Sequence, residues 1–184
     1  MTMRILCFES GGTKLVAAMS DSRGQILQVK QRRRSAEQTA AETLEVLVDM
    51  GRELSEEEPP AAIGFGFGGT VDRDIGEPVA CFHESGWESV RAGERLKKEF
   101  QVPVFIENDC NLAALAEAVT GYGIRTGTVF YVTVGTGIGG GIVKDGRLFT
   151  SGKFGEGEIG HLVVEPGGPK CPCGNRGCLE TLCS

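Results

Sequence analysis

One imidazole and three thiols lie close together near the C-terminal end of this sequence, within the segment 155–180. They belong to His161, Cys171, Cys173 and Cys178, and glycine and proline residues separate them. Structural zinc sites take four nitrogen and sulfur ligands in a tetrahedron, and glycine and proline allow the sharp turns that such a site needs. The spacing therefore predicts a loop that folds around a zinc ion.

The same cysteines have a second interpretation, because free cysteines are often small buried hydrophobic residues and stay reduced inside cells. The pair Cys171 and Cys173 alone does not decide between the two. Cys178, the glycines and the upstream His161 favour the metal site. Since protein atoms fill all four positions, no position remains for a reacting water. We therefore expect a structural zinc ion, with the chemistry elsewhere in the chain.

Composition argues against several classes of protein. The chain has 184 residues, 40% of them hydrophobic and 24% charged, which is typical of a globular protein. No apolar run is long enough to cross a bilayer, and the first residues lack a secretory signal. The net charge of −6 argues against a nucleic-acid surface, and the run at 32–34 is interpreted as a solvated edge. We expect a cytoplasmic protein without nucleic-acid or membrane partners. The cysteines outside the zinc segment are expected to be reduced core residues: Cys7, Cys81, Cys110 and Cys183.

The chain begins with short strands and turns. Apolar runs at 3–8 and 15–19 flank the turn Gly11–Lys14, and a third run follows at 26–29, which predicts an antiparallel meander. The backbone N–H groups and the threonine hydroxyl of the turn are groups that bind phosphate. An ordinary hairpin turn explains the same residues, so the turn alone does not identify a phosphate site.

The following segments alternate between helix and strand. Helices are predicted at 35–54, with Ser35 as the cap, and at 87–100, and strands are predicted at 61–67 and 102–106. A meander followed by this alternation indicates an α/β layer with helices on its faces.

Polar residues at Glu107–Asn111 follow the strand predicted at 102–106 and precede a helix predicted at 112–119. Asparagine and aspartate are favoured helix caps, which is a structural explanation of the segment. The functional alternative is a carboxylate at the end of a strand, facing the crevice in which α/β proteins bind ligands. The segment by itself leaves both interpretations open.

A second arrangement of strand, glycine turn and strand lies further along the chain. A β-branched strand at 128–134 leads into the glycine turn Gly135–Gly141, and strands at 142–144 and 147–149 flank an Asp-Gly hairpin turn. No helix follows the glycines, so their G-x-G-x-x-G spacing is not a dinucleotide-binding motif. Two such glycine turns facing each other across one cleft would hold a polyphosphate.

Five motifs together resemble the ROK family (repressor, open reading frame, kinase). They are the zinc segment and the sequences GGTK at Gly11–Lys14, GGTVD at Gly68–Asp72, ENDCN at Glu107–Asn111 and GTGIGGG at Gly135–Gly141. The resemblance implies an α/β protein with the actin-like, ribonuclease H-like fold, in which ATP and a sugar lie between two lobes. A complete first lobe at 1–121 and a partial second lobe at 122–184 are expected. Enzymes of this family are sugar kinases such as glucokinase, fructokinase and N-acetylmannosamine kinase.

The resemblance also implies roles for single residues. Asp109 is implied to be the catalytic base, which accepts the proton of a sugar hydroxyl during attack on the γ-phosphorus of ATP. The residues implied to bind the sugar are Gly69, Thr70, Asn108, Asp109, Glu158, His161 and Glu180. The residues implied to bind ATP are Glu9, Gly11, Gly12, Thr13, Lys14, Gly135, Thr136 and Gly137. Mg²⁺ would bridge the phosphate oxygens, and zinc would fix His161 through one ring nitrogen while the other meets the sugar.

Two features depart from the family pattern. Glu9 stands where many members have aspartate, which implies a water-mediated link to Mg²⁺. Members typically continue beyond the position of Ser184, so the chain is either a fragment of a longer protein, which is the favoured interpretation, or completes its second lobe by association. Its second sheet is then expected to leave apolar side chains such as Val129, Phe130 and Val132 poorly covered.

Three hypotheses about function follow from the resemblance. The first is ATP-dependent phosphorylation of a hexose hydroxyl, as in a glucokinase or fructokinase. A sugar-sensing ROK transcriptional regulator is disfavoured, because the chain starts directly on a strand and its net charge is acidic. The third is a zinc-stabilised sugar-binding fragment without catalysis. The motifs do not name the sugar, and the resemblance allows a homo-oligomer.

Overall fold

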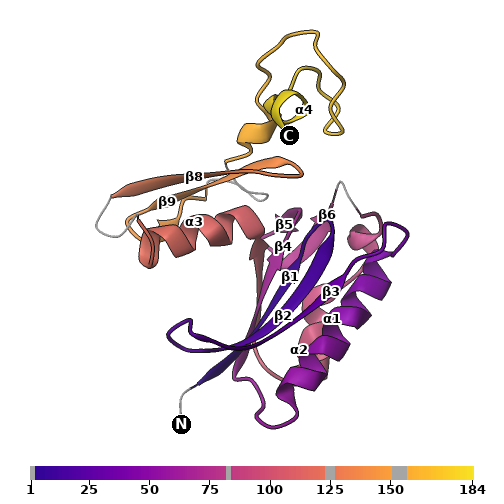
Figure 1. Cartoon of the computed structure of the whole chain (residues 1–184), viewed down its shortest axis with the longest axis vertical. Helices are drawn as coiled ribbons and strands as arrows, with labels where there is room; N and C mark the ends of the chain where they lie inside the picture. Colours follow the sequence, from indigo (N-terminus) through magenta and orange to yellow (C-terminus); the bar gives the residue numbers. More distant parts are fainter. Residues whose placement is uncertain (1–2, 82–83, 123–126, 151–156) are drawn as a thin grey trace. The chain divides into compact units, whose positions relative to one another are not determined.

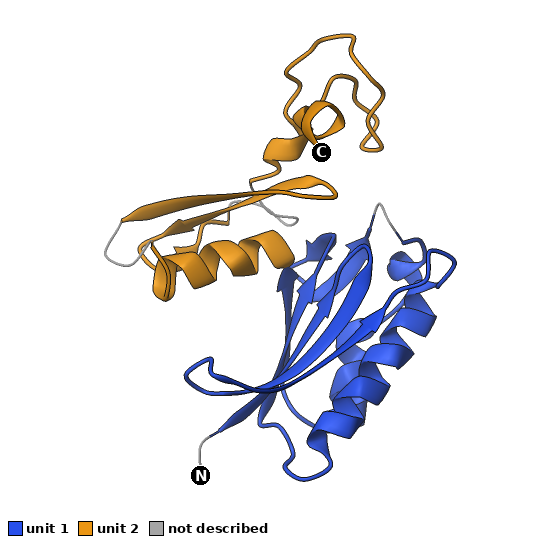
Figure 2. Cartoon of the chain, viewed as in Figure 1, with its two compact units in different colours: residues 1–108 blue, residues 109–184 orange. Residues whose placement is uncertain are grey.

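A computed structural model describes residues 3–81, 84–122, 127–150 and 157–184 of the chain (Figure 1). The chain forms two compact units, Met1–Asn108 and Asp109–Ser184 (Figure 2). The helix expected at 112–119 therefore belongs with the second unit. The boundary expected after residue 121 separates the two lobes that the family resemblance implies. The division into compact units does not test it, so it stays a prediction. The first two residues of the zinc segment, Gly155 and Glu156, lie outside the described residues.

The first unit is built on a five-stranded sheet in the order β3-β2-β1-β4-β7. Its strands are β1 (Arg4–Ser10), β2 (Lys14–Asp21), β3 (Ile26–Arg33), β4 (Ala62–Phe67) and β7 (Val104–Asn108). The first three pair in antiparallel fashion, whereas β4 and β7 run parallel to β1, so the predicted antiparallel meander is confirmed. A separate hairpin pairs β5 (Thr70–Asp72) with β6 (Glu77–Ala80).

One face of this sheet carries the hydrophobic core, beneath α1 (Ala40–Ser55) and α2 (Ala92–Phe100) (Figure 1). Successive side chains of a strand point to opposite faces, so the residues that belong to this core alternate along β1, β2 and β4. They are Leu6, Phe8, Leu15, Ala17, Met19, Ile63, Phe65 and Phe67. The helix residues of the same core include Leu44, Leu47, Val48 and Leu96.

The first helix begins later than predicted. It starts at Ala40, and its cap is Thr39 rather than Ser35. The Thr39 backbone N–H donates to Oε2 of Glu42 at 2.8 Å, and the Glu42 N–H donates to Oγ1 of Thr39 at 3.4 Å. This reciprocal capping box satisfies the backbone N–H groups of Thr39 and Glu42 and so favours a helix that starts at Ala40.

The helix predicted at 87–100 is two elements, the 3₁₀ turn η1 (Trp87–Ser89) and α2, because Val90 between them is extended. Trp87 is buried, and its ring centroid lies 4.8 Å from that of Phe67. The indole therefore packs in the core instead of on an amphipathic helix. The start of α2 is capped by Glu77, whose carboxylate accepts the N–H groups of Gly93 and Glu94 at 2.8 and 3.1 Å.

Charged side chains join α1 to α2 on their outer surface. Arg95 donates to Glu45 and to Glu99, both at 2.8 Å, and Arg52 donates to Glu99 at 2.6 Å. The guanidinium of Arg52, followed by that of Arg95, lowers the pKa of Glu99 to about 2. The negative charge of Glu99 is therefore part of the contact between the two helices.

We expect Glu99→Gln to destabilise the first unit at neutral pH by about 1 kcal/mol or less, the range of exposed ion pairs. The folded pKa lies below the ordinary value of 4.5, so this stabilisation is present above about pH 4.5 and is lost as the pH falls toward 2. Chemical denaturation of both proteins across this pH range measures the difference. The exposed residue Glu57 provides the control: Glu57→Gln should show no such dependence. If Glu99→Gln remains less stable than the wild-type protein near pH 2, the ion pairs of Glu99 with Arg52 and Arg95 are not the cause of the difference.

The second unit packs α3 (Asp109–Val119) against a three-stranded antiparallel sheet in the order β10-β9-β8. Its strands are β8 (Thr128–Val134), β9 (Ile138–Lys144) and β10 (Arg147–Leu148). The segment Gly135–Gly141 was predicted to be one turn, but β9 already begins at Ile138. A Cβ on Gly141 would lie 2.8 Å from the Cβ of Ala114 in α3. The later glycines therefore let the strand approach the helix.

The rest of the second unit has little regular structure. The 3₁₀ turn η2 (Ile159–His161) and α4 (Leu179–Cys183) flank the loop that carries the cysteines. On β8, Phe130 is 52% exposed and Val132 is 43% exposed, as expected, whereas Val129 is half-buried. Among the helices that the structure describes, none has both the length and the apolar character needed to cross a membrane.

None of the seven cysteines forms a disulfide, which agrees with the prediction that the four outside the zinc segment are reduced. The expectation that the four outside the zinc segment are core residues is wrong for Cys183, which is exposed. Cys7, Cys81 and Cys110 are half-buried.

Candidate functional site

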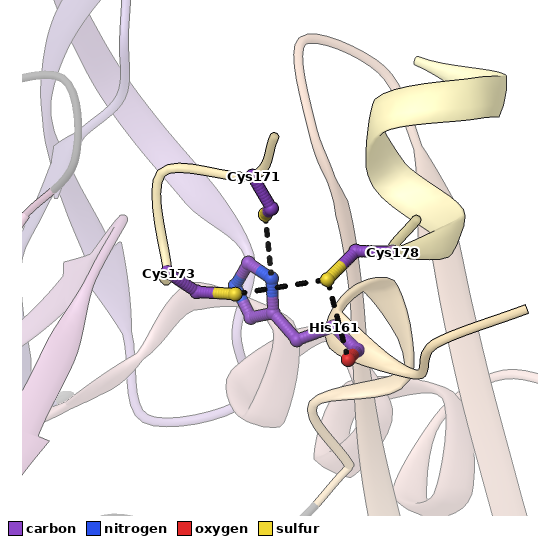
Figure 3. A group of neighbouring side chains, drawn as sticks. All are labelled: His161, Cys171, Cys173 and Cys178. Carbon is purple, nitrogen blue, oxygen red and sulfur yellow. Dashed lines mark hydrogen bonds between the residues drawn. The ribbon is translucent and has the colours of Figure 1, made fainter. Parts of the chain in front are cut away.

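The four predicted metal ligands meet at one point in the second unit (Figure 3). A ring nitrogen of His161 and the Sγ atoms of Cys171, Cys173 and Cys178 all lie within 4.8 Å of one another. Sγ of Cys173 and Sγ of Cys178 are 3.7 Å apart, and Sγ of Cys171 lies 3.6 Å from Nδ1 of His161. Zinc bonds of about 2.3 Å to sulfur and about 2.0 Å to nitrogen place tetrahedral ligand atoms about 3.5–3.8 Å apart. The donor set therefore fits a tetrahedral zinc ion.

Backbone hydrogen bonds shape the loop that carries the cysteines. The Gly174 N–H donates to the Cys171 carbonyl at 3.0 Å, and the Cys171 N–H donates to the Asn175 carbonyl at 2.9 Å. Gly177 has a φ of +75°, and a Cβ at this position would overlap the carbonyl oxygen of Glu165. Only glycine satisfies both conditions, so the loop requires glycine where the sequence has it.

Burial and hydrogen bonding shift the pKa values of two of the thiols in opposite directions. Burial raises the pKa of Cys178 to about 12, whereas the backbone N–H of Asn175 lowers the pKa of Cys173. A buried thiol with a raised pKa keeps its proton unless a metal ion replaces it. Free thiols would need no common centre, so the convergence of four donor atoms favours the metal interpretation.

Three of the predicted motifs lie at the ends of neighbouring strands, at one edge of the first sheet. Ser10 at the end of β1 pairs with Phe67 at the end of β4, and Phe67 pairs with Asn108 at the end of β7. These strands are parallel, so their carboxyl ends meet at the edge where α/β proteins bind ligands. The turns that begin at Gly11 and Gly68 and the side chain of Asn108 therefore belong to one edge of the fold.

Hydrogen bonds hold this edge together. Nδ2 of Asn108 donates to the Gly69 carbonyl at 3.1 Å, which joins two residues implied to bind sugar. Glu107 accepts Nε and Nη2 of Arg73 at 3.1 and 3.3 Å, and it accepts the Asn108 N–H at 2.8 Å. Sequence reasoning missed Arg73, because no local pattern links it to Glu107.

Asp109 directly follows β7 and is the first residue of α3. Its Oδ1 accepts the Cys110 N–H at 2.8 Å, a position that suits an acidic group in the first turn of a helix. Burial, with a smaller contribution from the Asp109 carboxylate, raises the pKa of Cys110 to about 12, so this thiol is not a reactive nucleophile. Asp109 thus stands at a strand end and at a helix start, the place that both interpretations of the segment require.

Glu180 lies against the glycine turn that precedes β9. The Ile138 N–H donates to Oε2 of Glu180 at 2.8 Å, and the Gly135 N–H donates to the Gly137 carbonyl at 2.9 Å. A Cβ on Gly137 would lie 2.5 Å from the same carboxylate oxygen. The structure therefore connects a residue implied to bind sugar with a turn implied to bind phosphate.

Most of the other candidate residues lie at the surface, whereas Gly11 and Thr70 are half-buried. Those that the structure shows as exposed are Glu9, Gly12, Thr13, Lys14, Gly135, Thr136 and Glu158. Glu158 also precedes η2, where its carbonyl accepts the His161 N–H at 3.0 Å. The two glycine turns belong to different units, so their pairing across one cleft stays a prediction.

Arg34 is buried, which the sequence did not indicate. Its exposed fraction is 8%, whereas Arg32 and Arg33 are exposed, so the prediction of a solvated edge is wrong for Arg34. Its guanidinium contacts the Gly12 carbonyl and Glu84. The residues next to Arg34 in the sequence do not indicate that its side chain is buried, because its partner Glu84 comes from a distant segment of the chain.

Comparisons with known proteins bear on this arrangement. A family model described as the ROK family matches residues 5–184. A glucokinase of Thermotoga maritima is 35% identical over 183 residues, which are 99% of this chain and 57% of that protein. A xylose repressor of Bacillus subtilis is 33% identical over 147 residues, which are 77% of this chain and 38% of the repressor.

A crystal structure of a ROK family glucokinase from Streptomyces griseus, in complex with glucose and AMPPNP, has the same fold. Its TM-score with this chain is 0.86 at 30% identity, covering 97% of this chain and 56% of that one. The expected α/β, actin-like fold is therefore confirmed. The chain spans little more than half the length of these two kinases.

Proposed function

The chain belongs to the ROK family, and we propose that it carries the catalytic residues of an ATP-dependent hexose kinase. The observation that carries this proposal is the edge of the first sheet, where the Asn108 amide is fixed to Gly69 and Asp109 follows directly. The likeness to a glucokinase over 99% of this chain supports it.

In this proposal Asp109 is the general base. A sugar hydroxyl is a weak nucleophile until a positioned carboxylate takes its proton. The hydroxyl oxygen forms a bond to the γ-phosphorus of ATP while the bond from that phosphorus to the β–γ bridging oxygen breaks. The proton passes to the Asp109 carboxylate, and the products are a sugar phosphate and ADP.

The sugar is proposed to lie between Asp109 and the zinc loop. The residues that would hold it are Gly69, Thr70, Asn108, Asp109, Glu158, His161 and Glu180. His161 faces Sγ of Cys171 with Nδ1, so a bound zinc ion would fix the orientation of the ring and direct Nε2 toward a sugar hydroxyl. Because protein atoms supply all four ligands, zinc would organise the pocket and take no part in the reaction.

The phosphates of ATP are proposed to contact both glycine turns, Gly11–Lys14 and Gly135–Gly137. Backbone N–H groups of such turns bind anions. Mg²⁺ bound with ATP would neutralise charge that develops during transfer. The exposed carboxylate of Glu9 would contact that ion through a water molecule, because its stem is longer than that of aspartate.

A transcriptional regulator is the second candidate. The observation in its favour is the identity of 33% with a xylose repressor over 77% of this chain. A regulator would use the same sugar-binding residues to sense a sugar, without transfer of a phosphoryl group. A sugar-binding fragment without catalysis would, like the regulator, bind a sugar and transfer no phosphoryl group from ATP. Unlike the regulator, it would not bind DNA.

We expect ATP-dependent phosphorylation of at least one sugar among glucose, fructose, mannose and N-acetylmannosamine. Release of ADP, measured for this chain and for the full-length gene product side by side, tests the proposal. Calorimetric binding of a sugar without affinity for ATP would instead support the non-catalytic fragment. Specific DNA binding without turnover would support the regulator.

A further inference from the structure

Arg34 holds the turn Gly11–Lys14 from inside the fold. Its backbone N–H donates to the Thr13 carbonyl at 3.0 Å. Its guanidinium donates to the Gly12 carbonyl from Nε at 3.2 Å and from Nη2 at 3.0 Å. One residue therefore binds two successive carbonyls of the turn.

Glu84 balances the charge of Arg34. Nη1 of Arg34 lies 3.8 Å from Oε1 of Glu84, too far for a hydrogen bond but close enough for attraction between buried charges. The two side chains are only 4% and 3% exposed. Glu84 also accepts the Thr43 hydroxyl, and it accepts Nε1 of Trp87 at 2.9 Å. Thr43 and Trp87 are fully buried, so the ion pair is tied to the hydrophobic core.

Stability alone does not account for this arrangement. Replacing a buried ion pair with apolar groups of similar volume is often neutral or stabilising. The contact with the Gly12 carbonyl has a further effect, because C=O and N–H of a trans peptide point in opposite directions. With its carbonyl held by a cation, the peptide between Gly12 and Thr13 is polarised, and its N–H becomes a stronger donor to an anion.

We propose that Arg34 is a positioning residue for nucleotide binding. With Glu84 as its anchor, it fixes the turn so that the Thr13 N–H faces the phosphates of ATP. This inference rests on the proposed function, because it takes Gly11–Lys14 to be a phosphate site. Arg34 acts through Gly12 and Thr13, so its loss should affect the affinity for nucleotide more than the affinity for sugar.

The kinetic test compares Arg34→Met with Arg33→Met, which removes the same charge from the neighbouring exposed residue. Arg34→Met is expected to raise the KM for ATP at least about tenfold, the effect of losing one hydrogen bond from the Thr13 N–H to a charged phosphate. The KM for the sugar is expected to stay within about twofold of the wild-type value. Arg33→Met is expected to match the wild-type protein in both constants. Equal KM values for ATP in the two variants would overturn the proposal.

A double variant separates positioning from stability. Arg34→Met leaves Glu84 buried without its cation, which destabilises the fold, whereas Arg34→Met/Glu84→Gln removes both charges and should recover stability. A merely structural ion pair predicts that the KM for ATP recovers as well. Positioning by Arg34 predicts a KM that stays raised about tenfold in the double variant, and a wild-type value there would refute it.

Hydrogen exchange distinguishes failure of this inference from failure of the proposed function. The Gly11 N–H donates to the Lys14 carbonyl at 3.1 Å in the ordered turn. Its exchange is expected to be at least about tenfold faster in Arg34→Met and in the double variant than in Arg33→Met. Wild-type protein that phosphorylates no sugar would refute the kinase proposal, and the exchange rates would still decide whether Arg34 holds the turn. Equal rates in all three variants would show that it does not.

Discussion

Replacing Asp109 with asparagine is expected to lower kcat for sugar phosphorylation by about 10²–10⁴-fold, the contribution typical of a general base. Asparagine has nearly the same shape, and its amide oxygen can accept the Cys110 N–H that Oδ1 of Asp109 accepts at 2.8 Å. The amide group cannot take up the proton of a hydroxyl. We therefore expect the fold and the KM for ATP to be retained. Initial rates of ADP release at saturating sugar and ATP measure the loss.

Asp145→Asn is the matched control for this prediction. Asp145 lies in the turn between β9 and β10 with a φ of +51°, a conformation that asparagine adopts as readily as aspartate. The control makes the same change of charge in the same unit, and wild-type kcat is expected. If Asp109→Asn also keeps wild-type kcat, another group accepts the proton and the assigned base is wrong.

The parts of the candidate site that lie within one segment were predictable from the sequence. His161 and the three cysteines belong to one short segment of the sequence, so their spacing and the glycines between them already predict a common centre. The turn after β1 is likewise a local pattern, an apolar strand followed by glycine. Family resemblance added the roles of these residues, and the match over residues 5–184 shows the family.

Contacts between distant segments were not predictable. Arg33 and Arg34 are neighbours in one basic run, yet only Arg34 is buried, because the fold brings Glu84 to it. A charged side chain is buried only where a partner compensates its charge. When that partner belongs to another element, the residues next to the charged side chain in the sequence do not indicate it. The same reason explains Gly141, which appeared to belong to a turn but gives Ala114 of α3 room to pack.

Removing one cysteine of the cluster is expected to release the metal. Cys178→Ser replaces a buried Sγ, 3.7 Å from Sγ of Cys173, with a hydroxyl that does not form a thiolate ligand. Structural zinc contributes about 10–16 kcal/mol to the folding of zinc-finger peptides, so this loop should depend strongly on the ion. We expect stoichiometric zinc in the wild-type protein and almost none in the variant, as measured by elemental analysis after dialysis.

Cys183→Ser is the matched control, because Cys183 is exposed and lies outside the cluster of four donors. Glu180 follows Cys178 closely and accepts the Ile138 N–H at 2.8 Å. Loss of the metal should therefore disturb both His161 and Glu180, and raise the KM for the sugar at least about tenfold, the effect of losing one hydrogen bond between the sugar and a charged group. Zinc retained by Cys178→Ser, or lost from Cys183→Ser, would contradict the assignment of ligands. Zinc lost without a change in the KM for the sugar would show that the loop stabilises the second unit but does not organise the sugar pocket.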